Sequence, residues 1–134
     1  MTANCDNEGP PNLAEIKRLA RPALKTIPKK FRDKVEGLII RVNDFPDAAT
    51  EREMGLKSSF DLLGLYRGVS LDRKGISDTS ENVNIIFLYR RPILDYWCET
   101  GEDLSHVVRH VLIHEIGHHF GFSDDDMERI ERQR

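Results

Sequence analysis

The sequence predicts one α+β domain, in which a small mixed sheet of three to four strands packs on a central helix, with further helices at both ends. Three observations lead to this prediction. Strand-like runs lie between helix-like segments along the chain. The segment 102–120 is apolar around most of its circumference, which is typical of a helix buried on most sides. A length of 134 residues suits one core; we assign residues 12–134 to this domain and residues 1–11 to a disordered leader.

The first predicted element is a helical segment over residues 12–35. Apolar residues recur there at helical spacing, and Asn12 is a suitable N-cap. Proline lacks an N–H and clashes with the preceding turn, so Pro22 is expected to kink or divide the segment and Pro28 to end it. A short helix is expected to follow, around residues 29–35.

Three strands are predicted from runs rich in β-branched and aromatic residues, at 37–42, 62–69 and 83–89. Between the first two, Asp47 is expected to cap a short helix that Gly55 ends. The polar, turn-rich stretch before the third strand is expected to be a loop.

The last third of the chain is predicted to be helical. Pro92 suits the first position of a helix, so residues 93–98 are expected to form a short one before the central helix. Ser123 is expected to cap a final helix over 124–133, with Asp126 completing a capping box.

The central helix carries the pattern H-E-x-x-H-x-x-G-x-x-D. His114 and His118 lie one turn apart on one face, so they can place two imidazole nitrogens on one zinc ion. Glu115 lies beside them and can reach a metal-activated water as general base. Gly121 can end the helix, which lets Asp124 fold back as a third, oxygen ligand. Three protein ligands leave one position open, as in catalytic zinc sites.

Other residues near the motif are alternatives for the third ligand or for a supporting role beside the metal. Acidic residues are favoured at the start of a helix by its dipole, so Asp125 or Asp126 are alternatives to Asp124, or acceptors of hydrogen bonds from the ligands. His119 is expected to pack in the core, cap the helix or support a ligand. His110 lies one turn before His114 and can line the pocket, although a structural role is favoured.

This constellation predicts a zinc-dependent peptidase acting on a peptide or protein substrate. Zinc lowers the pKa of water toward about 7 and polarises a carbonyl, and Glu115 would pass the proton to the leaving amine. If the strand 83–89 forms the sheet edge above the site, it would hold an extended peptide as an added strand.

Composition restricts the other classes of partner. The chain has 20 Lys and Arg against 23 Asp and Glu, a net charge of -3, which argues against nucleic acid. No apolar run approaches the ~18 residues that a membrane span needs. Cys5 and Cys98 are not expected to pair, so a reducing cytoplasm is the expected location.

The motif and two other runs resemble a known group. HEIGHHFGFSD resembles the elongated motif of the metzincin clan of zinc peptidases, in the version that ends in Asp. Together with LLGLYRG (62–68) and IIFLYRRPI (85–93), it is similar to a small bacterial family of zinc metallopeptidases with a minimal zincin, matrix-metalloprotease-like fold. The resemblance covers residues 36–130. It implies zinc on His114, His118 and Asp124, with Glu115 as base.

The sequence departs from the wider clan at its end. Metzincins place a methionine turn well downstream of the third ligand, whereas Met127 follows Asp124 too closely for that turn. The lower subdomain that forms half of a typical cleft is also missing. A small or specific peptide substrate, or an activity that needs a partner, is therefore expected.

Two other functions compete with a peptidase. A compact bacterial endoribonuclease uses a similar spacing of histidines, but Glu115, Asp124 in place of a third His, and the acidic net charge favour the peptidase. A non-catalytic, zinc-stabilised interaction domain is the other alternative, and the intact Glu115 argues against it.

Overall fold

The computed structural model describes residues 10–32, 37–70 and 82–132. The helices are α2 (Leu13–Lys25), α3 (Lys29–Arg32), α4 (Ala48–Met54), α5 (Arg90–Thr100), α6 (Leu104–Phe120) and α7 (Asp124–Arg132), and the strands are β1 (Ile39–Asn43), β2 (Gly64–Ser70) and β3 (Asn82–Tyr89). The predicted α+β class is confirmed. The assignment of residues 1–11 to a leader stays a prediction, because residues 1–9 lie outside the described ranges, as does most of the expected loop after β2.

The strands form a three-stranded mixed sheet in the order β1-β3-β2. β1 runs parallel to β3, and β2 runs antiparallel to it. The expectation that strand 83–89 forms the sheet edge is therefore wrong, because β3 is paired on both sides. Its side chains explain this position: Ile86 and Leu88 are fully buried, and a central strand is where such residues lose most contact with water. The edge next to α6 belongs to β2.

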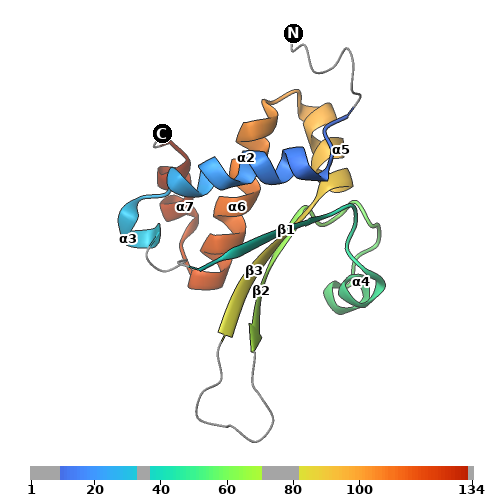
Figure 1. The fold of residues 1–134 in the computed structure, drawn as a ribbon, viewed down its shortest axis with the longest axis horizontal. Helices are drawn as coiled ribbons and strands as arrows, with labels where there is room; N and C mark the ends of the chain where they lie inside the picture. Colours follow the sequence, from blue (N-terminus) through green and yellow to red (C-terminus); the bar gives the residue numbers. More distant parts are fainter. Residues whose placement is uncertain (1–9, 33–36, 71–81, 133–134) are drawn as a thin grey trace, which may run out of the picture.

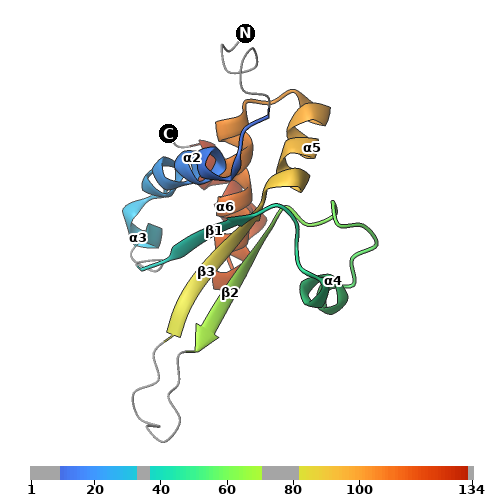
Figure 2. The same ribbon diagram turned by 45° about the vertical axis from the view of Figure 1, so that its right-hand side comes forward.

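The core lies between the sheet and the helices that cover one of its faces. Ile40 on β1 is paired with Ile86 on β3, and both are buried on that face. α6 contacts α2, α5, α7, β2 and β3, so the prediction of a central helix is confirmed. In both views α2 crosses α6 on this side of the sheet, whereas α4 lies beyond the opposite face (Figures 1 and 2).

Several predicted helix ends are confirmed. The Asn12 side chain accepts a hydrogen bond from the Glu15 amide (2.9 Å), and the Glu15 carboxylate accepts one from the Asn12 amide (2.8 Å). The Asp47 side chain accepts one from the Thr50 amide (2.8 Å) and so caps α4, which Gly55 ends. These bonds satisfy amides that have no partner within their helix.

Two expectations based on proline are corrected. Pro22 does not divide α2, which runs as one helix, because only one N–H is lost near its end and its inner face packs on α6; a kink at Pro22 stays a prediction. α5 begins at Arg90, so Pro92 is its third residue and not its first. The missing N–H of Pro92 costs nothing there, because amides of the first helical turn have no intrahelical partner.

Candidate metal centre

The connection between α6 and α7 folds the second helix back along the first. Gly121 ends α6 in the left-handed conformation (φ 74°), and the Phe122 amide donates to the Gly117 carbonyl (2.8 Å). The Ser123 hydroxyl then accepts a hydrogen bond from the Asp126 amide (3.0 Å), and the Asp126 carboxylate accepts one from the Ser123 amide (3.3 Å). The predicted capping box is thus confirmed, and it occupies Asp126 as a cap.

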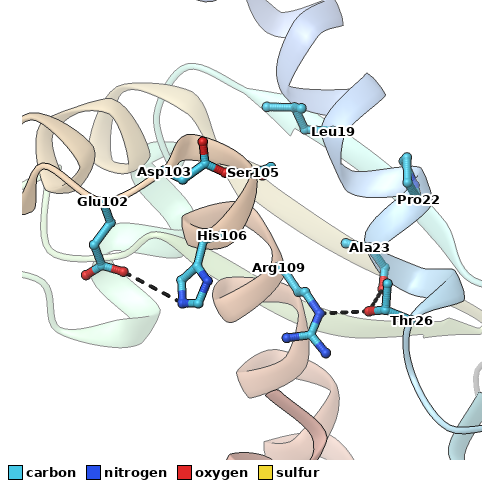
Figure 3. A pocket seen from close by; sticks show the side chains of 9 residues that line it. All are labelled: Leu19, Pro22, Ala23, Thr26, Glu102, Asp103, Ser105, His106 and Arg109. Carbon is cyan, nitrogen blue, oxygen red and sulfur yellow. Dashed lines mark hydrogen bonds and ion pairs between the residues drawn. The ribbon is translucent and has the colours of Figure 1, made fainter. Parts of the chain in front are cut away.

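A buried arginine fixes the far end of α7 against α6. The Arg109 guanidinium, on α6, donates to the carbonyls of Ile130 (2.7 Å) and Glu131 (2.8 Å). Its Nε donates to Thr26 Oγ1 at the end of α2 (2.7 Å; Figure 3). Carbonyls at a helix C-terminus lack intrahelical partners and carry partial negative charge, so a cation there stabilises the helix end. Arg109 therefore holds the backbone at Ile130 and Glu131 against α6.

The Glu131 carboxylate lies between two histidines of α6. His110 Nδ1 is 2.8 Å from Glu131 Oε1, and His114 Nε2 is 3.0 Å from Glu131 Oε2. The two imidazole centroids are 4.1 Å apart. One donor atom from each of the three residues lies within 4.8 Å of the others, which is a spacing that suits a metal ion.

An acidic cavity of about 350 Å³ surrounds this cluster, lined by His110, His114, Asp124, Asp125, Glu128 and Glu131. Asp124 therefore shares a cavity with His114, whereas His118 does not line it. The structure brings together one predicted histidine and the predicted aspartate, but it adds His110 and Glu131 in place of His118. A larger cavity of about 670 Å³, between α2 and the start of α6, contains His106 and Arg109 and none of the motif residues (Figure 3).

Glu115 lies on the side of α6 that faces β2, whereas His118 is directed toward solvent. The imidazoles of His114 and His118 are 6.1 Å apart between centroids and nearly perpendicular, and His118 is exposed. Successive i, i+4 positions drift by about 40° around a helix, which turns His118 away from the side that carries His110. The neighbouring His119, expected as a core, capping or supporting residue, stacks on the Tyr66 ring of β2 at 3.8 Å.

Burial perturbs the Glu115 carboxyl. Desolvation raises its pKa from the usual 4.5, while the charge of His118 and a hydrogen bond from the Tyr66 backbone amide oppose the rise. The Glu115 side chain packs closely under Gly64, where an added Cβ would lie 3.4 Å from Glu115 Cγ and 2.7 Å from a Val111 methyl. A half-buried carboxylate with a raised pKa is the usual form of a general base.

The comparison with known families fits this site. Residues 35–134 match the model of the zincin-like metallopeptidase family. The chain belongs to this family. No curated protein matches it.

Membership of the zincin-like family implies a metal-dependent peptidase, and zinc is the typical metal. The residues present fit such an ion, because imidazole nitrogens and carboxylate oxygens are the usual donors to zinc and both kinds meet at His114. Met127, which follows the motif too closely for a methionine turn, is buried against Gly117 beneath the motif helix. No helix in the described part of this zincin-like chain is long and apolar enough to span a bilayer.

Glu131 is the residue that sequence reasoning missed. It lies in a stripe with Asp124 and Glu128, at i, i+4 and i+7 of α7, so that three carboxylates follow one face of the helix. That face meets the histidines of α6. The stripe is visible in the sequence, but which face of α7 packs against α6 depends on the turn at Gly121.

Proposed function

We propose that this zincin-like domain is a zinc-dependent peptidase in which His114, His118 and Asp124 hold the metal and Glu115 is the general base. The observation that carries the proposal is the environment of Glu115. This carboxylate is half-buried, follows His114 directly on the helix, and is held by a backbone amide of the edge strand. Zinc in such a site supplies a Lewis acid that polarises a carbonyl and acidifies water.

Glu115 would move the proton during hydrolysis. A carboxylate with a raised pKa accepts a proton from the attacking water more readily than an ordinary one, and can then release it to the nitrogen of the departing amine. The Tyr66 amide keeps the carboxylate directed toward the sheet edge, where a substrate backbone would lie. Desolvation by β2 and α6 prevents bulk water from competing for the same proton.

The outer edge of β2, on the side away from β3, offers a place for an extended peptide. The Tyr89 amide donates to the Leu63 carbonyl (2.9 Å), which fixes the alternation of backbone groups along the antiparallel pair. The backbone groups of Tyr66 and Gly68 accordingly face away from β3. A peptide could form backbone hydrogen bonds with this edge, except at the Tyr66 amide, which already donates to Glu115. This replaces the strand 83–89 as the expected substrate strand.

The charge around the site favours a peptide over a nucleic acid. Four carboxylates, those of Asp124, Asp125, Glu128 and Glu131, line the cavity beside His114. They would repel phosphates, so an endoribonuclease is disfavoured. We also propose a cytoplasmic location, because Cys98 is exposed and forms no disulfide within the described part of the chain, which is typical of a reducing compartment.

Glu115→Gln tests the proposal, with Glu102→Gln as a matched control at an exposed position before α6. Zinc content is measured by elemental analysis, and hydrolysis with a fluorogenic peptide library. Glu115→Gln should keep its zinc and lose at least ~100-fold in rate, the usual contribution of a general base, while the control keeps both. A zinc-loaded wild type that cleaves no peptide would favour the non-catalytic interaction domain. RNA cleavage that survives Glu115→Gln would favour the nuclease.

A further inference from the structure

We propose that His110, His114 and Glu131 form a second binding position for a divalent transition-metal ion, which shares His114 with the H-E-x-x-H set. This inference rests on the proposed function only in that both sets use His114. It does not depend on whether the substrate is a peptide.

The donor geometry is the first support. His110 Nδ1 and His114 Nε2 point at the two oxygens of one carboxylate, at 2.8 and 3.0 Å. Ligands of a tetrahedral zinc ion, at about 2.0–2.2 Å from the metal, lie about 3.3–3.5 Å from one another. The two nitrogen–oxygen distances would have to lengthen by only about 0.5 Å to admit an ion. Small rotations of the side chains would suffice for this change. Two histidines and a glutamate are a ligand set found in zinc proteins.

Electrostatics is the second support. The Glu131 carboxylate lies near the C-terminus of α7, where the helix dipole disfavours an anion. The Arg109 guanidinium donates to the main-chain carbonyls of Ile130 and Glu131. Within the described ranges, no Lys or Arg lines the cavity, although Glu128 pairs with Arg132 at its rim (3.1 Å). A divalent cation would offset this surplus of negative charge.

Rigidity is the third support. The Glu131 backbone is fixed through Arg109, which also joins α6 to the end of α2. The Glu131 side chain is 18% exposed, and those of His110 and His114 are 41% and 34% exposed. The donors are therefore held by the fold and yet remain open to an ion from solvent, as a binding site requires.

The sharing of His114 has a consequence. Its Nε2 is directed at Glu131, and one nitrogen cannot serve two ions at once. The two sets should therefore exclude each other at this atom, so that one chain holds one tightly bound ion and not two. An ion on the His110 side would withdraw His114 from the H-E-x-x-H set.

The test uses the full chain, freed of metal and titrated with Co²⁺, whose visible absorption reports its ligands. His118→Gln breaks the H-E-x-x-H set and should still bind one Co²⁺ per chain. Adding Glu131→Gln or His110→Gln to it should weaken binding more than ~100-fold, because a direct ligand matters more than the 10–100-fold typical of outer partners. His106→Gln in the same background is the matched control and should change nothing.

Two outcomes would overturn the proposal. One is that His118→Gln no longer binds Co²⁺ while Glu131→Gln binds it as the wild type does. The other is that Glu131→Gln and His110→Gln leave the affinity of the His118→Gln protein unchanged. Circular dichroism verifies the fold, and His110→Gln, at a partly exposed position, keeps the test decisive if Glu131→Gln does not fold. Either outcome leaves the peptidase proposal intact, since that proposal depends on Glu115.

Discussion

Gly117, inside the motif, is expected to set the distance between α6 and α7. By helix propensity alone, Gly117→Ala should stabilise the protein by about 1 kcal/mol. The added Cβ, however, would lie 2.3 Å from Met127 Sδ and 2.8 Å from its Cγ, where unstrained contacts are about 3.5–4.0 Å. Met127 is only 2% exposed, so it cannot move into solvent. Overpacking of this kind costs about 1–3 kcal/mol, and we expect a net loss of about 1 kcal/mol.

A double-mutant cycle separates the two effects. Urea unfolding followed by far-UV circular dichroism gives the free energy of unfolding for Gly117→Ala, Met127→Ala and the double variant. In the Met127→Ala background the clash is gone, so Gly117→Ala should gain about 1 kcal/mol, which gives a coupling of about 2 kcal/mol. If Gly117→Ala stabilises the wild type by the same amount, the contact with Met127 does not determine the spacing of the two helices.

Three further predictions concern single side chains. The Tyr66 hydroxyl is buried without a hydrogen-bond partner among the described residues, so Tyr66→Phe should cost no stability and gain up to ~1 kcal/mol in urea unfolding; a loss above ~1 kcal/mol would mean that the hydroxyl is bonded. Burial raises the pKa of Tyr89 from 10.0 to about 12, so the stability it contributes is complete below pH 10 and falls as the pH rises toward about 12. In urea unfolding across that range, the free energy of unfolding of Tyr89→Phe should fall less steeply with pH than that of the wild type. Equal slopes for the two proteins would contradict the raised pKa of Tyr89. Arg109→Met removes the donors to the α7 carbonyls and should cost about 3 kcal/mol with faster amide exchange in α7; a cost below ~1 kcal/mol would contradict the anchoring role.

Local signals in the sequence predicted the elements well and their exact ends less well. The capping residues Asn12, Asp47 and Ser123 were recognisable because a side chain that binds a nearby amide acts over three residues. Pro92 was misplaced by two positions, because proline is tolerated anywhere in the first helical turn. These are local effects, and local sequence carries the information for them.

The order of the strands in the sheet could not be predicted from local sequence. The apolar run 83–89 predicted a strand but not its neighbours, and it was expected at an edge that belongs to β2. Pairing joins segments that are far apart in the chain, so a strand's own sequence carries little information about its neighbours.

The sequence by itself determined the motif helix, the side chains that can bind zinc, and Glu115 as the candidate base, because these follow from helical spacing and donor chemistry. It did not determine which donors meet. That depended on Gly121, on the approach of Met127 to Gly117, and on Arg109 at the end of α7, which together bring Glu131 between His110 and His114. The physical reason is that a metal site needs atoms within a few ångströms of one another, and only the packing of two helices brings residues from different helices so close.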